Sequence, residues 1–430
     1  MSSKGIGKYR TYTNPTIGSI PQVQALKADA RMALLAVAKV LPFKTNQYIL
    51  DELIDWMSVP HDPIFTQNFP VPDMLLPEEV DPIVSLLNND PTSVMKEVLA
   101  QRARIRLMQA KCPLDPTSIP NIDGQVVPGL WRTFRETVLV YPMHAQGCFA
   151  FCTHCFRWMR HFGIGNDFCT EPNDAVAKYL ERNPEISDVV LSGGDPMVMS
   201  TEMLNRYIDP LFQVESLRNI RISTRSISWW PYRFTNEADS DDLLRLFETI
   251  VERGKSLSIQ AQVCHVRELS TPVVENAIRR IRSSGAIIRC QFPMLNHVNA
   301  DVRALVDLWS REVSLGLIPY YLFVEDGAGP ADYFKLPVVE VLRVYKQAQS
   351  QISGLARTVR GPVFNYQNNK VMLDDIVEFR GEKFFVLKYI QAHRPEDTGR
   401  VVFAKFDKEV YRSEQLQFGV GEPSLSSLES

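Results

Sequence analysis

The stretch DVVLSGGDPMVMSTEMLNRYIDPLFQVESLRNIRISTRS, residues 188–226, combines two β-branched runs with a helical segment between them. DVVL and IRIS have the composition of buried strands, whereas TEMLNRYIDPLFQV spaces its apolar residues three or four apart, as an amphipathic helix does. A strand, a helix and a strand in this order predict a right-handed βαβ unit with two parallel strands.

The same alternation continues on both sides of this unit. Further strands are predicted at 137–142, 257–263, 286–292 and 318–326, with helical patterns between them. Six strands alternating with helices indicate an α/β fold built on a parallel sheet. Because a complete barrel of this kind has eight strands, we predict a (β/α)6 partial TIM-type barrel over residues 132–350.

The flanking segments have other patterns. Residues 1–131 are predicted to form an N-terminal helical extension, in which 59–82 is an extended, proline-rich connector and 112–131 is a loop. Residues 351–430 are predicted to form a C-terminal α+β extension, because FFVLKYIQAHRP and GRVVFAKFD read as strands. These extensions either cap the open barrel or build the interface of a homo-oligomer, and the sequence leaves both alternatives open.

The composition is that of a globular protein. Of the 430 residues, 45% are apolar and 23% are charged, and the net charge of −3 gives no electrostatic case for a nucleic-acid partner. The longest apolar stretch near the start, MALLAVAKVLPF (32–43), is too short to cross a membrane. The first thirty residues lack the apolar centre of a signal peptide. We therefore expect a cytoplasmic enzyme with no membrane partner.

Three of the seven cysteines lie in one short segment, GCFAFCTHCFRWMR (147–160), with the spacing C-x3-C-x2-C. A structural zinc site usually has four protein ligands, often as two pairs, and no second pair follows here. Cys148, Cys152 and Cys155 therefore suit a [4Fe–4S] cluster that leaves one iron open to another ligand. A zinc site completed by His154, or a set of free structural thiols, remains an alternative on spacing alone.

Polar or glycine-rich residues follow every predicted strand. The cysteines come after the first strand, SGGDP after the second, STRS after the third, CHVRE after the fourth, QFPMLNHVN after the fifth and EDGAG after the sixth. Parallel βα sheets place their functional sites at the carboxyl ends of the strands. The pattern therefore predicts a site at that edge of the sheet.

The cysteine spacing after the first strand resembles the radical S-adenosylmethionine superfamily. Within it, VVLSGGDPMVMS, RISTRSISWWPYRFT, CHVRELST, RCQFPMLNHVNAD and IPYYLFVEDGAGPADYFKLP are similar in order and spacing to the lysine 2,3-aminomutase family. The upstream DPIFTQNFPVP is similar to the segment that precedes the barrel in that family. The resemblance implies that a reduced [4Fe–4S] cluster cleaves S-adenosylmethionine to a 5′-deoxyadenosyl radical, which abstracts hydrogen from an amino-acid-like substrate.

The resemblance also implies a role for individual residues. The three cysteines would hold the cluster, and a second group would bind S-adenosylmethionine: Ser192, Gly193, Gly194, Asp195, Arg225, His265 and Gln291. Glycine is needed in the SGGDP turn because a Cβ would block the close approach of a ligand to the backbone. Arg157 would grip the substrate carboxylate, since a guanidinium pairs with a carboxylate through two hydrogen bonds. Asp326 would pair with a distal amine of the substrate.

The family pattern breaks after the barrel. The aminomutases hold pyridoxal phosphate through a lysine in a glycine-rich loop, whereas this chain has GLARTVRGPVFNYQNNKVMLDD (354–375). Lys370 is the nearest candidate lysine, and a lysine in a polar turn is the structural alternative. Arg360 or a neighbour replaces a family aspartate, and could meet a second carboxylate or a phosphate. MLNH (294–297) also lacks the basic residue that the family has there.

Three hypotheses follow. In the first, the chain is a radical S-adenosylmethionine enzyme that acts on an amino-acid-like, carboxylate-bearing substrate without pyridoxal phosphate. In the second, it is a divergent amino-acid 2,3-aminomutase that binds pyridoxal phosphate through Lys370. In the third, it is a non-catalytic iron–sulfur or zinc protein. Both enzymatic hypotheses require an electron donor such as flavodoxin or ferredoxin.

Overall fold

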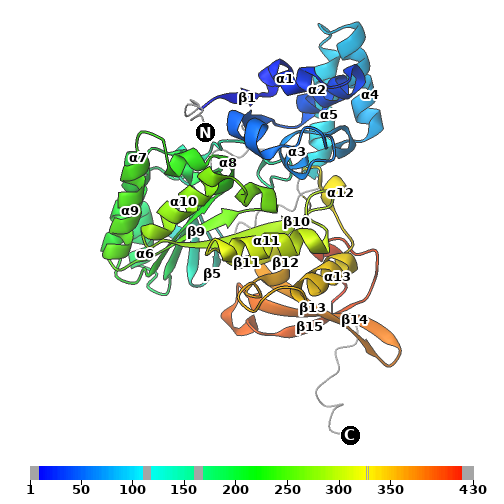
Figure 1. Cartoon of the computed structure of the whole chain (residues 1–430). Coiled ribbons are helices and arrows are strands. Elements are labelled where there is room, and N and C mark those ends of the chain that lie inside the picture. Colours follow the sequence, from blue (N-terminus) through cyan, green and yellow to red (C-terminus); the bar gives the residue numbers. More distant parts are fainter. Residues whose placement is uncertain (1–8, 110–117, 159–167, 326, 328, 419–430) are drawn as a thin grey trace.

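The computed structural model describes residues 9–109, 118–158, 168–325, 327 and 329–418. A mixed sheet of 11 strands, in the order β15-β14-β13-β12-β11-β10-β9-β8-β7-β6-β5, forms the centre of this α/β structure (Figure 1). Its strands are β5 (Leu130–Phe134), β6 (Thr137–Val140), β7 (Asp188–Leu191), β8 (Asn219–Thr224), β9 (Ser256–Gln262), β10 (Ile287–Met294), β11 (Ile318–Val324), β12 (Arg360–Tyr366), β13 (Asn369–Phe379), β14 (Glu382–Gln391) and β15 (Val401–Lys405).

Strands β6 to β12 are all parallel, and the first six of them overlap the six strands predicted from the sequence. Strand β5 joins β6 in antiparallel orientation, and β12 to β15 are mutually antiparallel. The prediction of a parallel α/β sheet is therefore confirmed.

Helices connect the parallel strands, as the sequence pattern predicts. They are α6 (Ala175–Glu181), α7 (Thr201–Ile208), α8 (Ser226–Trp229), α9 (Ser240–Glu252), α10 (Pro272–Ser283), α11 (Val302–Ser314), α12 (Ala331–Phe334) and α13 (Val338–Gln349). Several begin at a side chain that accepts hydrogen bonds from free backbone N–H groups: Ser200 caps α7, Thr271 caps α10 and Asp301 caps α11.

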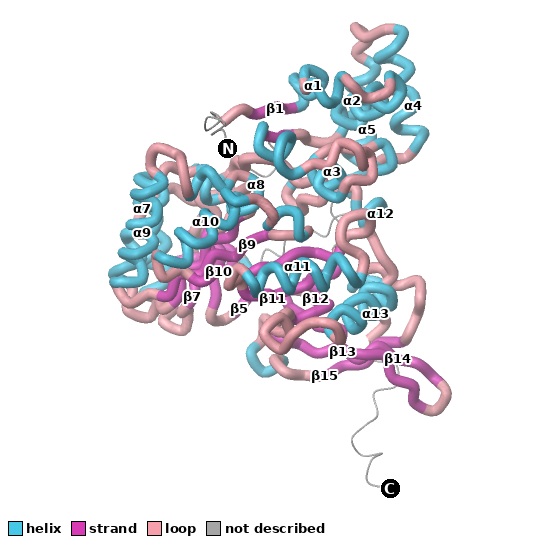
Figure 2. The backbone as a smooth tube through the Cα atoms, viewed as in Figure 1, coloured by secondary structure: helices cyan, strands magenta, loops and turns pink. Residues whose placement is uncertain are grey.

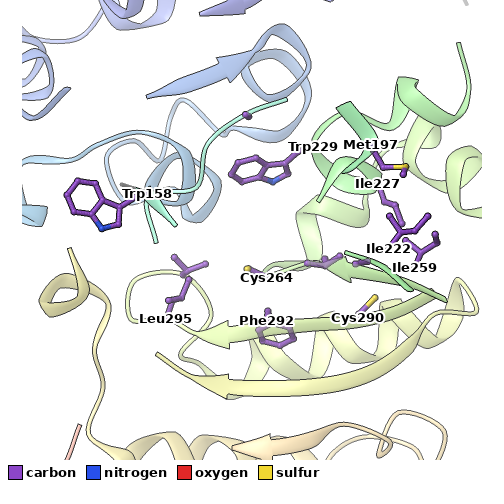
Figure 3. Close-up of a cluster of buried hydrophobic side chains, with 14 of the residues drawn as sticks. Trp158, Met197, Ile222, Ile227, Trp229, Ile259, Cys264, Cys290, Phe292 and Leu295 are labelled. Atoms are coloured by element: carbon purple, nitrogen blue, oxygen red, sulfur yellow. The ribbon is translucent and has the colours of Figure 1, made fainter. Parts of the chain in front are cut away.

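Two of the central strands, β8 and β10, alternate between buried and partly exposed residues, whereas β7 and β9 are buried on both faces over most of their length. In β8, Ile220, Ile222 and Thr224 are buried on the side of the helices, whereas Arg221 and Ser223 alternate with them and are partly exposed. Figure 3 shows Ile222 and Ile259 gathered with Met197 and Ile227 on the buried side. A parallel sheet with helices on both faces would be apolar on both. The opposite, polar face is called the inner face below.

The two ends of this sheet region approach each other. The ring of His393, just after β14, contacts the carbonyl of Thr133 in β5 at 2.7 Å. The Nζ of Lys370 in β13 lies 5.5 Å from the centre of the Phe134 ring. Because β5 and β13 are separated by seven strands in the sheet order, these contacts require a strongly curved sheet.

The N-terminal region forms a largely helical body beside the carboxyl ends of the parallel strands (Figures 1 and 2). Its elements are β1 (Thr11–Thr13), α1 (Pro21–Gln24), α2 (Ala28–Val40), β2 (Lys44–Asn46), α3 (Pro63–Asn68), α4 (Pro77–Asn89) and α5 (Met95–Gln109), followed by the short hairpin β3 (Asn121–Ile122) and β4 (Gln125–Val126).

Two predictions for this region are wrong. The connector predicted over 59–82 contains α3 and the start of α4, because Pro63 and Pro77 each occupy a first helical position, where the missing N–H costs nothing. The loop predicted over 112–131 contains the β3–β4 hairpin and the first residues of β5, and the predicted boundary at 131/132 falls inside that strand.

The C-terminal segment continues the central sheet instead of forming a separate layer. The strands predicted near 384–395 and 399–407 correspond to β14 and β15. The hairpin of β12 and β13 was not predicted, because its turn is built from Gln367 and Asn368, both with positive φ, and contains no glycine. No helix within the described ranges is both long enough and apolar enough to span a lipid bilayer.

Candidate functional site

The segment after β6 that carries the three cysteines, here called the cysteine loop (residues 146–157), is held by the N-terminal region. The Phe151 N–H donates to the Lys44 carbonyl at 2.8 Å, and the Thr153 N–H donates to the Gln67 carbonyl at 2.9 Å. The Lys44 ammonium donates to the Cys148 carbonyl at 2.6 Å. The path of the loop is therefore set by residues far upstream in the chain.

The three cysteines Cys148, Cys152 and Cys155 form no disulfide and are partly buried. Burial raises the pKa of Cys148, and the nearby negative charges of Asp195, Cys155 and Cys152 raise it further. Among the described residues, no group of three or more His, Cys, Asp or Glu side chains has the spacing of a metal site. The three thiols nevertheless lie on one short loop, where Cys152 and Cys155 influence the pKa of Cys148, and soft donors of this kind suit iron–sulfur ligation.

The SGGDP turn, at the carboxyl end of β7, packs directly on the start of the cysteine loop. The Gly194 N–H donates to the Ala145 carbonyl at 2.7 Å. A Cβ on Gly193, where φ is +141°, would lie 2.5 Å from that same carbonyl oxygen. A Cβ on Gly194 would lie 2.4 Å from the Gly147 carbonyl oxygen. The glycines are therefore needed for the contact between the turn and the loop, besides the ligand approach that the sequence suggested.

Asp195, in the same turn, directs its buried carboxylate at the end of β8. It accepts hydrogen bonds from the Thr224 hydroxyl at 2.7 Å, the Ser226 hydroxyl at 2.8 Å and the Arg225 N–H at 3.0 Å. Burial raises the pKa of Asp195, and these hydrogen bonds oppose the rise. The carboxylate joins the ends of two neighbouring strands. Ser192, at the start of the turn, donates its N–H to the Val140 carbonyl at 2.9 Å.

Arg225, just past the end of β8, lies against the cysteine loop. Its Nη1 donates to the Cys152 sulfur at 2.9 Å, and its Nη2 lies 3.2 Å from both carboxylate oxygens of Glu268 and also donates to Gln67 Oε1. Burial alone would lower the pKa of Arg225, but the negative charges of Cys152 and Glu268 raise it above its usual value. The guanidinium also lies 3.7 Å from the centre of the Trp229 ring.

Glu268 and Gln67 belong to this site, although the sequence singled out neither. Glu268 is fully buried and accepts hydrogen bonds from the N–H groups of Cys264 and His265, at 2.9 and 3.1 Å. Gln67 is also fully buried. The sequence indicated the segments that contain them, CHVRE for Glu268 and DPIFTQN for Gln67. Only the fold shows that both side chains contact Arg225.

Three buried polar atoms around the thiols have no hydrogen-bond partner among the described residues: Gln67 Nε2, Arg225 Nε and His154 Nδ1. Buried donors are rarely left unsatisfied in proteins. An iron–sulfur cluster is held by thiolates and accepts hydrogen bonds at its sulfur atoms. The three thiols and the nearby unpartnered donors therefore fit such a cluster.

His265 follows β9, and Gln291 lies within the next strand, β10. The Nδ1 of His265 accepts the Arg267 N–H at 3.3 Å; burial lowers the pKa of His265. Gln291 pairs with Gln262 and Tyr321 on the neighbouring strands and belongs to the inner face. Of the two, His265 therefore lies at the edge where the sequence predicted a site, whereas Gln291 lies within β10.

Arg157, at the end of the cysteine loop, reaches the SGGDP turn. Its Nη1 donates to the Gly193 carbonyl at 2.5 Å, and its guanidinium carbon lies 4.1 Å from the centre of the Tyr141 ring. The fold thus brings this arginine to the same strand ends as the thiols. Asp326, the predicted partner of a substrate amine, lies outside the described residues.

Lys370 lies on the inner face and not in a turn. It is the second residue of β13, and its Nζ lies 4.4 Å from the centre of the Tyr321 ring. Burial, together with the positive charges of Arg221 and Arg360, lowers the pKa of Lys370 to about 7. Its amine is therefore largely neutral slightly above neutral pH, the state in which a lysine is nucleophilic.

Comparison with known proteins gives matches over most of the chain. Residues 137–255 match the family model described as 4Fe-4S single cluster domain. A putative L-lysine 2,3-aminomutase of Aquifex aeolicus is 26% identical over 390 residues, which cover 90% of this chain and 91% of that protein. The L-lysine 2,3-aminomutase of Haemophilus influenzae is 28% identical over 254 residues, covering 57% of this chain and 70% of that protein.

The similarity to solved structures is weaker. A crystal structure of Streptococcus suis SuiB bound to S-adenosylmethionine aligns with a TM-score of 0.36 and 10% sequence identity. The alignment covers 64% of this chain and 57% of that one.

Proposed function

We propose that this chain is a radical S-adenosylmethionine enzyme of the lysine 2,3-aminomutase type, which abstracts hydrogen from a carboxylate-bearing, amino-acid-like substrate without pyridoxal phosphate. The observation that carries this proposal is the meeting of the cysteine loop with Arg225 and the SGGDP turn at one edge of the parallel strands.

Within this proposal, Cys148, Cys152 and Cys155 hold a [4Fe–4S] cluster. When bound, the cluster and S-adenosylmethionine supply a 5′-deoxyadenosyl radical. The unpartnered donors of Gln67 and Arg225 face this region and can donate to its sulfur atoms.

Other residues of the chain bind and orient the small molecules. The backbone of Ser192, Gly193 and Gly194 is proposed to contact S-adenosylmethionine, and Asp195 keeps that turn in place through the end of β8. His265 lies at the same edge, after β9, and Gln291 lies within β10.

Arg157 is proposed to bind the substrate carboxylate through the guanidinium donors that do not contact Gly193. The radical and the substrate then meet over the inner face, which the curved sheet shelters from bulk water. This arrangement corresponds to the proposed (β/α)6 partial barrel of residues 132–350, flanked by the extensions 1–131 and 351–430.

The proposal is tested by anaerobic reconstitution with iron and sulfide. We expect about four irons per chain and, after addition of reductant and S-adenosylmethionine, formation of 5′-deoxyadenosine. Cys152→Ala should lose both, whereas Cys290→Ala, which removes a buried thiol on the helix-covered face of β10, should keep both.

A folded wild-type protein that binds neither iron nor S-adenosylmethionine would contradict the proposal. Iron binding without any 5′-deoxyadenosine would instead support the non-catalytic metal protein among the alternatives.

A specific observation favours the second candidate, an aminomutase dependent on pyridoxal phosphate. The partly buried Lys370 has a lowered pKa of about 7, which suits a lysine that attaches a carbonyl cofactor. Against this stands the tight β12–β13 hairpin, which offers no glycine-rich backbone to surround a phosphate. A pyridoxal absorption band that disappears in Lys370→Ala would establish this candidate, and its absence from every preparation would exclude it.

Three further features belong to the same proposal. A small electron-transfer protein such as flavodoxin or ferredoxin supplies the electron that the cluster needs. A cytoplasmic location agrees with the six described cysteines, none of which forms a disulfide. The N-terminal helices and the outer strands β14 and β15 are available for a homo-oligomer interface.

A further inference from the structure

The inner face carries a group of basic side chains that come from four strands and are partly or fully exposed. Two tyrosines of β11 lie at its centre. Lys370 Nζ is 4.4 Å and the Arg360 guanidinium carbon 6.0 Å from the centre of the Tyr321 ring, and the Arg289 guanidinium carbon is 5.3 Å from the centre of the Tyr320 ring. Together with Arg221 of β8, these side chains are called the basic cluster: Arg221, Arg289, Arg360 and Lys370.

The members of the basic cluster influence one another electrostatically. Arg221 and Arg360 both contribute to the low pKa of Lys370, and Arg289 contributes to a lowered pKa of Arg221, after burial in each case. Four strands that are far apart in the sequence thus direct positive charge at one place.

Only one carboxylate balances this charge within the part of the chain that the structure describes. Asp188 accepts two hydrogen bonds from Arg221, one of them at 2.8 Å from Nε, and both side chains are 14% exposed. Arg289, Arg360 and Lys370 form no ion pair with any described carboxylate. Arginine does not lose its proton at any ordinary pH, so the charges of Arg289 and Arg360 are not compensated by any carboxylate of the described residues.

The tyrosine rings only partly offset this charge. A cation over an aromatic ring gains a weaker attraction than a guanidinium paired with a carboxylate through two hydrogen bonds. Lys370 can lose its proton, whereas Arg289 and Arg360 cannot. The Arg360 side chain is exposed to solvent and can therefore contact an entering molecule. The cluster therefore has the charge and the access of a site for an anion.

We propose that the basic cluster binds a second carboxylate, at the distal end of the amino-acid substrate. This inference rests on the proposed function, in which Arg157 binds the substrate's other carboxylate at the strand ends. The substrate class is then a dicarboxylic amino acid, and an amino acid with a distal amine would meet like charge at Arg360 and Lys370.

Ligand binding to the reconstituted holoenzyme, measured by titration calorimetry with S-adenosylmethionine present, tests this inference. The probes are L-glutamate, L-norvaline, which has a methyl in place of the distal carboxylate, and L-lysine. We expect L-glutamate to bind at least about tenfold more tightly than the other two.

The variants test whether the basic cluster causes this preference. Arg360→Gln should weaken L-glutamate binding about tenfold and leave L-norvaline binding unchanged, and Lys370→Met should lower the L-glutamate affinity in the same direction. Arg343→Gln removes a matched, exposed arginine that pairs with Glu340 on α13, and should change neither affinity.

Results of two kinds would overturn the inference. One is an L-lysine affinity equal to or above that of L-glutamate, or an L-glutamate affinity unaffected by both cluster variants. The other is displacement of L-glutamate by pyridoxal phosphate with an absorption band that Lys370→Met loses, because the anion would then be the phosphate of a cofactor. If 5′-deoxyadenosine forms in either case, the proposed function stands and only the substrate class is wrong.

Discussion

At the scale of single residues, Lys370 is the clearest case of a side chain whose chemistry is set by the fold. Its pKa of about 7 lies well below the usual value of 10.5, chiefly because of burial and then because of two arginines. The folded chain therefore loses this proton earlier than the unfolded chain does as the pH rises. Between about pH 7 and 10, folding releases a proton, and the stability of the folded state increases with pH.

Comparison of the wild type with Lys370→Met should reveal this linkage. The stability of the wild type relative to the variant should rise between pH 7 and pH 9, by at most about 1.4 kcal/mol per pH unit. Below pH 7 the difference should level off. Denaturant unfolding at several pH values provides the measurement. Lys346→Met, which replaces an exposed lysine, is the control, and its difference from the wild type in the free energy of unfolding should not change between pH 7 and pH 9. A difference that is independent of pH would contradict the lowered pKa.

Residues of the site differ in how far the sequence could predict them. The spacing of Cys148, Cys152 and Cys155 is local and therefore visible in the chain. The contacts of Arg225 with Gln67 and Glu268 join residues separated by 158 and 43 positions, and no local pattern encodes them. Asp195 was predicted as a ligand residue, but its carboxylate is occupied by the end of β8.

At the scale of elements, the contact between the SGGDP turn and the cysteine loop leaves no room for a larger side chain. Gly194→Ala would place a Cβ 2.4 Å from a backbone oxygen of Gly147, which cannot move without displacing the loop. We expect this variant to bind less than about half of the wild-type iron and to lose 5′-deoxyadenosine formation, because the thiols would no longer face one another.

Iron content and electron paramagnetic resonance after identical reconstitution would measure the effect. Gly354→Ala is the matched control, since a Cβ there meets nothing within 4 Å and φ is not positive. Full iron content in Gly194→Ala would show that the turn does not position the loop.

Local sequence patterns predicted the central strands and helices well, but predicted the elements of the N-terminal region and the C-terminal segment poorly. The six parallel strands were found because apolar, β-branched runs alternate with amphipathic helices. Helix α4 was missed because prolines usually interrupt helices, yet Pro77 lies at its first position. The β12–β13 hairpin was missed because Gln367 and Asn368 adopt positive φ without the glycine that normally signals such a turn.

At the scale of the whole molecule, Asn68 joins the N-terminal body to the cysteine loop. Its Nδ2 donates to the Lys44 carbonyl at 3.0 Å and to the Phe151 carbonyl at 2.9 Å. Asn68→Asp keeps the shape but places a carboxylate against two carbonyl oxygens, so we expect a loss of about 2–4 kcal/mol in local stability.

Hydrogen exchange should show faster exchange of the Phe151 and Thr153 amides in Asn68→Asp, with the sheet strands β8 to β10 unchanged. The [4Fe–4S] cluster of the variant should also decay faster in air. Asn89→Asp, at the exposed end of α4, is the control and should match the wild type in both measurements. Unchanged exchange in the loop of Asn68→Asp would contradict a holding role for the N-terminal body.

The long separation between the cysteine loop and its supports has a consequence for how the protein matures. Phe151 and Thr153 take their backbone partners from Lys44 and Gln67, and Arg225 reaches the same place from the middle of the sheet. Contacts between such distant parts of a chain form late in folding, because closing long loops is slow. Iron delivered to a nascent chain would thus meet unorganised thiols, and productive cluster insertion has to wait until both halves of the protein have docked.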